Sequence, residues 1–389
     1  MRLWSPQAIE VDGLTDDRLS VVPDRPAVFL IHAREGVPYL ARTTLLRRRL
    51  LRLLGRRAKA SRLLSLREVA ARAEYHLTAS RLETSLVLYD VACSLYPERY
   101  RSVLRLRMPP YLKVGLTNAF PRCYLTTRLA GSRGLHYGPF RTRAVAEEYE
   151  RQFLGLFQIR RCQEDLAPSA AHPGCIYGEM NMCLRPCQQV VGPEEYSSEV
   201  ARVCEFLSSD GRSQLDAVLR ARDHLSETMR FEEAARLHKQ VEKIQQVLGL
   251  RDELVRDVEK LYGVAVTASV AEGCVELWFL LQGTWLPPVR FSVTASGGRA
   301  VSLDQRLREI IAALSPPVLS ARERQDHLAL LARWYYSSFR DGEWLSFNTL
   351  DDVPYRKLVR AISRVATGGT SLHNDGSHVP RGGFDDQSS

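Results

Sequence analysis

The sequence has no apolar run that approaches the length of a membrane span. Its first thirty residues also lack the layout of a signal peptide. We therefore expect a soluble, cytoplasmic protein that has no membrane partner. Because that compartment keeps thiols reduced, the eight cysteines are predicted to be free or metal-bound rather than paired in disulfides.

The sequence also lacks the short motifs of several large enzyme classes. It has no G-x-x-x-x-G-K-[ST] phosphate loop, no G-x-S-x-G nucleophile elbow and no H-E-x-x-H zinc motif, which argues against the enzymes that depend on them. What it has instead is positive charge, since 54 Lys and Arg against 45 Asp and Glu give a net charge of +9 at pH 7. Such an excess favours a polyanionic partner, above all nucleic acid.

Four of the eight cysteines gather in one segment, residues 161–188, in the spacing C-x12-C-x7-C-x3-C. They are Cys162, Cys175, Cys183 and Cys187. Thiolates are the soft ligands that iron–sulfur clusters and zinc prefer. The prolines and glycines of the segment keep it from forming one helix, so the chain can curl around a shared metal centre. Four unrelated buried thiols are the alternative interpretation, and the spacing alone does not separate zinc from iron–sulfur.

The cysteine segment and its flanks resemble the UvrC family of bacterial excinuclease proteins. The similar stretches are PYLKVGLTNAFPRCYLTTRLAGSRGLHYGPFRT, LGLFQIRRC and CQQVVGPEEYSSEVARVCEFL. The resemblance extends over most of residues 25–345. Members of the family carry a [4Fe–4S] cluster on four cysteines placed like these, so the resemblance implies such a cluster here, with zinc the less expected metal.

Residues 25–102 resemble the GIY-YIG nuclease module that opens UvrC proteins. A strand at 27–32, a turn, a second strand and a basic helix follow one another as in that module. There, two strand tyrosines, a lysine, a helix arginine and a glutamate that holds a divalent metal carry out phosphodiester cleavage. The matching positions here are Phe29, Tyr39, Arg42, Arg49 and Leu88.

Two of these positions have lost the chemistry that the module needs. Phe29 keeps the ring but lacks the hydroxyl, and Leu88 cannot bind a hard cation. Asp90 lies two residues further on, about 200° around a helix, and would point elsewhere. The resemblance therefore implies a degenerate, inactive module that binds no Mg²⁺ or Mn²⁺. The alternative is a nuclease with a relocated metal ligand, because Tyr39, Arg42 and Arg49 survive.

The helix predicted after the second strand has LLRRRLLRLL at its centre. Its leucines form an apolar face, and its arginines form a band of positive charge without interspersed acids. DNA phosphates would relieve the repulsion within this band and release counterions, although a solvated helix face is the other interpretation. The predicted DNA-binding residues are Arg47, Arg48, Arg52, Arg56 and Arg57. Further positive charge that could contact phosphates lies at Arg128, Arg133, His136, Arg141 and Arg143.

Residues 213–249 show the periodicity of two amphipathic helices with a corner at Met229-Arg230-Phe231. The string SETMRFEEAARLHKQVEKIQ resembles the UVR motif of UvrB and UvrC proteins, which pairs with the same hairpin on a partner. The resemblance implies that this hairpin binds a UvrB-like helicase. Packing within the chain is the other interpretation. The expected contact residues are Phe231, Glu232, Ala235 and Leu237.

These observations predict an α+β, multidomain protein. Its expected parts are a lead-in at 1–24, a degenerate GIY-YIG-like α/β domain at 25–102, a middle region with the metal segment at 103–205, a UVR hairpin at 206–251, an α/β region at 252–366 and a disordered tail at 367–389. In UvrC proteins a ribonuclease-H-like nuclease domain and helix-hairpin-helix motifs follow this point, so the chain is interpreted as a truncated UvrC-like protein.

The expected function is binding of DNA and of a UvrB-like partner in nucleotide excision repair, without nuclease activity. Two alternatives belong to other classes. The first is a metal-dependent GIY-YIG endonuclease that makes an incision in excision repair. The second is a redox sensor that uses the cluster and the repair scaffold for another purpose.

Overall fold

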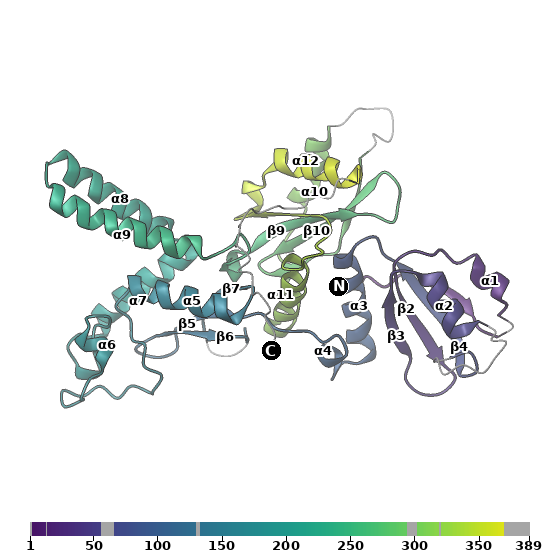
Figure 1. Cartoon of the computed structure of the whole chain (residues 1–389), viewed down its shortest axis with the longest axis horizontal. Helices are drawn as coiled ribbons and strands as arrows, with labels where there is room; N and C mark the ends of the chain where they lie inside the picture. The colour runs from purple at the N-terminus through teal and green to yellow at the C-terminus, as the bar shows by residue number, and fades with distance from the viewer. Residues whose placement is uncertain are drawn as a thin grey trace, which may run out of the picture.

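The computed structural model describes residues 2–12, 14–55, 66–129, 133–293, 302–318 and 320–368. This part of the chain combines helices with three antiparallel sheets, in agreement with the predicted α+β class (Figure 1). None of its helices is long and apolar enough to cross a membrane. The predicted disordered tail lies outside the described residues from 369 onward.

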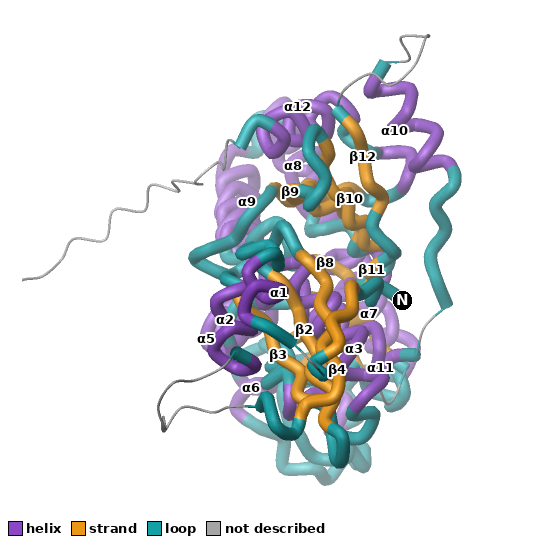
Figure 2. Tube along the Cα trace, turned by 90° about the vertical axis from the view of Figure 1, so that its right-hand side faces the viewer, coloured by secondary structure: helices purple, strands orange, loops and turns teal. Residues whose placement is uncertain are grey.

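The first sheet has the strand order β1-β4-β2-β3, and helices cover both of its faces (Figures 1 and 2). Phe29 and Ile31 pack with the leucines of helix α2 on one face, whereas Leu40 packs with helix α3 on the other. This split follows from the alternation of side chains along a strand. The elements are β1 (Gln7–Glu10), α1 (Asp16–Ser20), β2 (Ala27–Ala33), β3 (Tyr39–Thr43), α2 (Leu46–Leu54), β4 (Ala70–Leu77), α3 (Arg81–Leu95) and α4 (Tyr100–Val103).

Residues 1–24, expected to be a lead-in, contribute to this sheet. Strand β1 pairs with β4, and helix α1 lies beside α2. The apolar side chains Val11, Leu14, Leu19 and Val22 are buried in the core that α2 also lines. The polar composition of the segment concealed these four anchors, which are spaced irregularly along the chain.

The second sheet has the order β6-β5-β7-β8 and belongs to the middle region. A series of aromatic rings from β7, α5 and α7 fills its core. Strand β8 comes from beyond the helical hairpin and returns the chain to this sheet. The elements are β5 (Tyr111–Gly115), β6 (Cys123–Thr126), β7 (Gly134–Gly138), α5 (Arg143–Phe153), the short helix α6 (Ile176–Glu179), α7 (Pro193–Ser208) and β8 (Arg256–Asp257).

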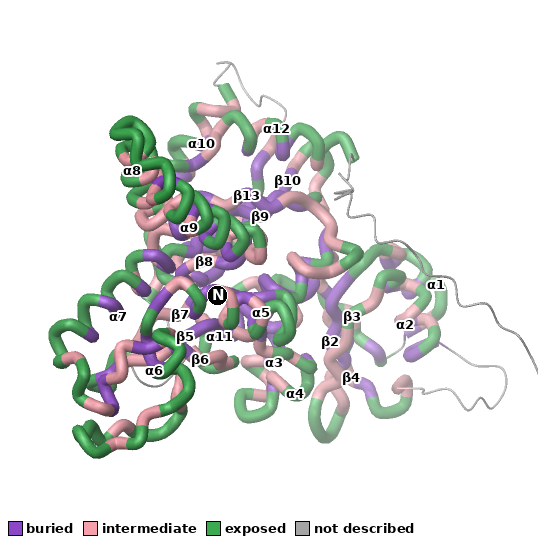
Figure 3. The backbone as a smooth tube through the Cα atoms, turned by 60° about the vertical axis from the view of Figure 1, so that its left-hand side comes forward, coloured by how far each residue is buried: buried purple, intermediate pink, exposed green. Residues whose placement is uncertain are grey.

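Two long helices, α8 (Arg212–Glu227) and α9 (Phe231–Gly249), form the hairpin that the sequence predicted. They lie antiparallel and project from the body of the molecule (Figure 1). No residue of α8 is buried, and only the inner positions of α9 are. Figure 3 shows this exposure along most of the hairpin.

The third sheet has the order β11-β10-β9-β13, and β12 also pairs with β10. Helices α10 and α12 share a core with one of its faces, and α11 shares a core with the other. Helix α11 also packs against α3, so it joins the third sheet to the first module (Figure 1). The elements are β9 (Tyr262–Ala268), β10 (Cys274–Leu281), β11 (Thr284–Trp285), β12 (Val289–Ser292), α10 (Leu303–Ala312), α11 (Ala321–Tyr335), β13 (Glu343–Phe347) and α12 (Tyr355–Ala366).

Candidate functional site

Three of the positions that match the nuclease motif lie together on the α2 face of the first sheet. Tyr39 opens strand β3, and Arg49 lies one helix further along the chain, on α2. The guanidinium Nη2 of Arg49 donates a hydrogen bond to the Tyr39 hydroxyl at 3.0 Å. The Phe29 ring lies 6.1 Å from the Tyr39 ring, centroid to centroid, in a tilted arrangement. The structure therefore preserves an aromatic–arginine constellation, with one hydroxyl where the motif has two.

The other two motif positions lie elsewhere. Arg42 pairs with Val28 in the register of β2 and β3, so its side chain leaves the sheet on the opposite face from Tyr39. Leu88, on α3, packs against the core that Leu40 and helix α11 also line. A leucine at this place contributes to the core between α3 and α11. The nearby Asp90 accepts hydrogen bonds from the backbone N–H groups of Leu3 and Trp4, at 2.7 and 3.1 Å, and so anchors the chain before β1.

Within the described ranges, no three His, Cys, Asp or Glu side chains form a group that could hold a metal ion. This holds for the surroundings of Tyr39 and for the cysteine segment alike. The absence of bound Mg²⁺ or Mn²⁺ in the first module stays a prediction.

The arginines of α2 make contacts within the chain. Arg47 donates to the carbonyl of Ser20 at 3.1 Å, and Arg48 forms an ion pair with Asp24 at 3.3 Å. Arg52 is exposed and also takes part in an intramolecular interaction. These contacts fasten the segment before β2 to the helix, so the basic band is less open than its sequence indicates. Two of the predicted DNA-binding residues, Arg56 and Arg57, lie outside the described residues.

The four clustered cysteines come from loops and short turns around α6. Cys183 and Cys187 are buried, Cys162 is half-buried and Cys175 is exposed just before α6. Burial raises the pKa of the Cys183 thiol, and the proximity of the other three thiols raises this pKa further. The four cysteines lie within a segment of 26 residues, 162–187, and the other three are close enough to Cys183 to act on the pKa of its thiol.

Two donors already point at sulfur in this neighbourhood. The backbone N–H of Arg185 lies 3.4 Å from Cys183 Sγ, and Nη1 of Arg160 lies 3.5 Å from Cys162 Sγ. Arg185 and Gln189 both adopt left-handed backbone conformations, which turn the chain tightly around Cys187. Donors directed at sulfur stabilise thiolates and tune iron–sulfur clusters, so this chemistry suits a metal-bound cysteine set.

The tip of the hairpin presents two large apolar side chains to solvent. Phe231 is 61% exposed and Met229 is 77% exposed. Glu232 and Ala235 are exposed beside them, and Leu237 is half-buried. All four predicted contact residues therefore lie in the first two turns of α9, whereas Ala234 and Val241 face α8 and the body of the molecule.

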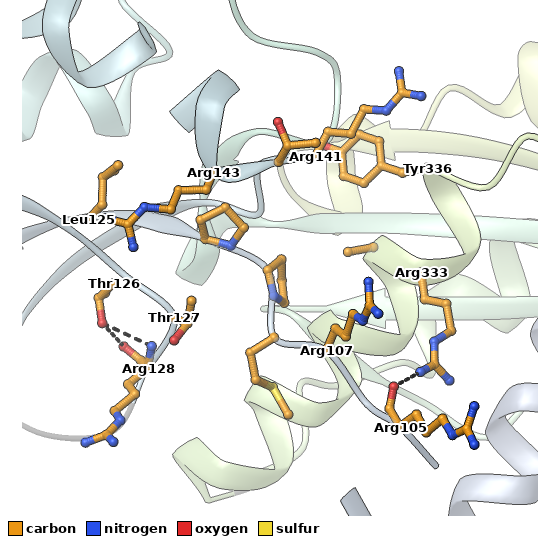
Figure 4. Close-up of a pocket in the computed structure, with 15 residues that line it drawn as sticks. Arg105, Arg107, Leu125, Thr126, Thr127, Arg128, Arg141, Arg143, Arg333 and Tyr336 are labelled. Atoms are coloured by element: carbon orange, nitrogen blue, oxygen red, sulfur yellow. Dashed lines mark hydrogen bonds between the residues drawn. The ribbon is translucent and has the colours of Figure 1, made fainter. Parts of the chain in front are cut away.

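A further group of charged residues brings together parts of the chain that the sequence does not connect. Arg128, Arg141 and Arg143, noted from the sequence, share a cleft with Arg105, Arg107 and Arg333 (Figure 4). The last of these lies on α11, 190 residues beyond Arg143. The local sequence does not indicate that Arg333 lies near the arginines of the middle region, because α11 approaches that region only in the tertiary fold.

Comparison with known proteins agrees with the sequence resemblance. Residues 109–206 match the family described as "UvrC/Cho excinuclease, middle domain". The UvrABC system protein C of Lachnospira eligens is 24% identical over 74% of this chain and 47% of the relative. The corresponding values are 22%, 92% and 59% for that of Ruminiclostridium cellulolyticum, and 27%, 68% and 43% for that of Proteus mirabilis. No solved structure matches. The chain spans about half the length of the curated relatives it matches, and with this middle domain and these relatives it is a UvrC-like protein.

Proposed function

We propose that this UvrC-like chain acts in nucleotide excision repair as a binding protein, which contacts DNA and docks on a UvrB-like partner without cutting DNA itself. The observation that carries the proposal is the hairpin of α8 and α9. It projects from the body (Figure 1). Phe231, the first residue of α9, is exposed at its tip. An exposed aromatic beside exposed polar residues is the composition of an interface anchor surrounded by a polar rim.

The two helices of the hairpin are long, but few of their side chains are buried. Helix α8 buries no residue, and α9 buries only one side along its length. The base of the hairpin packs against the core of the middle region through Ile244 and Val247, and its outer faces remain available to a partner. The resemblance of this segment to the UVR motif supports a second hairpin of the same kind as that partner.

The state of the first module supports a binding role. Phe29 supplies no hydroxyl, and Leu88 belongs to a hydrophobic core where the family motif has a metal ligand. Arg42 leaves the sheet on the face opposite Tyr39 and Arg49. A phosphodiester placed at Tyr39 would meet one hydroxyl and one guanidinium, but no carboxylate from Leu88 to bring a metal.

A [4Fe–4S] cluster in the middle region is part of the proposal. Cys162, Cys175, Cys183 and Cys187 would hold it, and the N–H of Arg185 already donates to the sulfur of Cys183. The cluster would supply a covalent staple between loops that have little regular structure. The residues around it support its thiolates with hydrogen bonds and shield the two buried ligands from water.

A second candidate function is metal-dependent strand cleavage by the first module. The 3.0 Å hydrogen bond between Arg49 and Tyr39 favours it, because it keeps a nucleophilic hydroxyl beside a cation. This candidate needs a metal ligand from a position other than Leu88.

One set of experiments on the whole purified chain tests the proposal. Calorimetry with the UvrB protein of the same organism and fluorescence anisotropy with lesion-bearing DNA measure binding. Incubation of the same DNA with Mg²⁺ or Mn²⁺ measures cleavage. We expect binding to both partners and no cleavage. Failure to bind UvrB would overturn the proposal, and cleavage that Tyr39→Phe abolishes would establish the second candidate instead.

A further inference from the structure

A cleft of about 850 Å³ lies between the middle sheet and helix α11 (Figure 4). Its most distinctive feature is charge, because six arginines and no Asp or Glu are among its lining residues. The arginines are Arg105, Arg107, Arg128, Arg141, Arg143 and Arg333. Guanidinium groups on two opposing walls create a strongly positive potential, which a narrow low-dielectric cleft focuses.

Four separate parts of the chain supply these arginines. Arg105 and Arg107 follow α4, Arg128 follows strand β6, Arg141 and Arg143 lie at the start of α5, and Arg333 lies on α11. Figure 4 shows Arg128 and Arg143 on one side of the cleft, and Arg105, Arg107 and Arg333 on the other. The cleft therefore exists only in the assembled molecule.

Part of this charge is used within the fold. Arg333 donates to the carbonyl of Leu104 at 3.1 Å and also to the carbonyl of Arg105, so it fixes the segment that carries Arg105 and Arg107. Arg143 pairs with Glu147 at 2.7 Å, but both side chains are mostly exposed, and such pairs contribute little. Near Arg141, the half-buried carboxylate of Asp252 accepts a hydrogen bond from the Tyr336 hydroxyl.

The remaining arginines have no such compensation. In the part of the chain that the structure describes, the guanidinium groups of Arg107 and Arg128 have no hydrogen bond or ion pair. Burial lowers the pKa of Arg333, and the charges of Arg42 and Arg107 lower this pKa further. Mutual repulsion among cations is costly unless an anion enters. Arg42, on strand β3, is therefore close enough to Arg333 to add to the repulsion that Arg333 experiences.

Helix α5 adds a directional contribution. Thr142 caps its N-terminus by accepting a hydrogen bond from the N–H of Val145 at 3.3 Å, and Arg143 is the first helical residue. The positive end of the α5 dipole therefore lies at the wall of the cleft, where an anion is stabilised.

We propose that this cleft binds the sugar–phosphate backbone of one DNA strand. The inference rests on the proposed function and names the surface that contacts DNA. Guanidinium groups bind phosphate oxygens bidentately, and several of them in one cleft can contact successive phosphates of a strand. The volume is that of a site for a ligand of a few nucleotides and is too small to enclose a duplex. A single phosphate would occupy only part of a cleft with six arginines.

The test compares two double variants of the whole chain that lose the same charge. Arg107→Gln with Arg128→Gln removes two unpaired cations from the cleft. Arg356→Gln with Arg360→Gln removes two exposed cations from α12, which covers the face of the third sheet opposite α11. Fluorescence anisotropy measures the binding of a labelled single-stranded oligonucleotide and of its duplex. The salt concentration is varied from about 50 to about 300 mM, a range that includes physiological salt.

Each phosphate contact with a single strand contributes about 0.7 to the slope of log K against log salt, so the loss of two contacts reduces this slope by about 1.4. At about 0.1 M salt, we therefore expect the cleft variant to bind the single strand about 25-fold more weakly than the wild type. The α12 variant should bind like the wild type. Equal weakening of the two variants, or a cleft variant with unchanged affinity and slope, would overturn the inference while DNA binding itself stands. A wild-type chain that binds neither oligonucleotide would overturn the DNA-binding part of the proposed function as well. Preference of the cleft for the duplex alone would overturn the assignment to one strand.

Discussion

Arg49 donates a hydrogen bond to the hydroxyl of Tyr39, ten residues earlier in the chain, and this contact ties helix α2 to the edge strand β3. Tyr39, Arg49 and the neighbouring Phe29 match positions of a nuclease motif, whereas the other two matching positions lie elsewhere. Arg42 leaves the sheet on the other face, and Leu88 packs into a separate core. The contact has a structural role, because it joins helix α2 to β3, the strand at the open edge of the first sheet.

Tyr39→Phe should leave the products of incubation with DNA unchanged, because we expect no cleavage by the parent chain. It should lower the free energy of unfolding by about 1.5 kcal/mol, since a partly buried hydrogen bond from a charged donor is lost. Urea unfolding and gel analysis of nicked DNA with Mg²⁺ or Mn²⁺ measure the two effects. A suitable control is Tyr262→Phe, whose half-buried hydroxyl has no hydrogen bond among the described residues. Cleavage that disappears only in Tyr39→Phe would contradict the inactive assignment.

Cys183→Ser should abolish iron binding and lower the melting temperature, because structural metal binding is coupled to folding. Iron, sulfide and zinc analysis of anaerobically purified protein, together with its visible absorption spectrum, measures the first effect. Cys274→Ser is the matched control, since Cys274 lies on strand β10, away from the cluster of thiols. Zinc in place of iron in the parent protein would show that the centre holds a single ion, and a metal-free parent protein would refute the centre.

Phe231→Ala should weaken binding to a UvrB partner by about 2–4 kcal/mol if this aromatic is the anchor of the interface. The fold should be unaffected, because the side chain is 61% exposed. Phe339→Ala provides the comparison, since Phe339 is 70% exposed on another part of the surface. Calorimetry that gives the same affinity for both variants and the parent chain would place the partner elsewhere.

Glu83 predicts a pH dependence of stability. Burial raises the pKa of this carboxyl to about 7, against the lowering effect of a hydrogen bond from the N–H of Ala79. Because the unfolded pKa is lower, the protonated form is favoured in the folded chain. The associated stability is complete below the unfolded pKa and is lost as the pH rises through about 7.

Glu83→Gln should remove this dependence, since the amide oxygen can still accept from Ala79 and carries no charge. Between pH 4.5 and pH 8, the parent chain should lose about 3 kcal/mol of its free energy of unfolding through this carboxyl, and the variant should not lose it. Urea midpoints from pH 4.5 to 8 provide the measurement, with the exposed Glu272→Gln as control. The same pH profile in Glu83→Gln and the parent chain would refute the assignment.

Local patterns were sufficient for several elements. The short apolar run around Phe29 and the turn before Tyr39 predicted strands β2 and β3, and Gly36, with φ of 93°, supplies the left-handed turn between them. The periodicity of residues 213–249 predicted both hairpin helices, and the corner falls at Met229 and Arg230 as expected. These features depend on neighbours in sequence, so propensity and spacing contain the information.

Other features are invisible or misleading in sequence. The arginines of α2 have the pattern of an open basic band, yet Arg47 and Arg48 contact residues before β2. Strand β1 joins the first sheet although the composition of its segment indicates a loose lead-in. Both outcomes depend on contacts between segments that are far apart, which a single sequence does not specify.

The sequence by itself determined the kinds of chemistry available to this protein: four clustered thiols, a hairpin with an aromatic corner, and a set of residues that resembles a nuclease motif but lacks one hydroxyl and one carboxylate. Only the tertiary structure decided which groups meet. Helix α11 packs between α3 and the third sheet, and this placement brings Arg333 beside Arg107 and sets the half-buried Leu88 against a core. Composition fixes what a side chain can do, whereas long-range packing fixes where it acts.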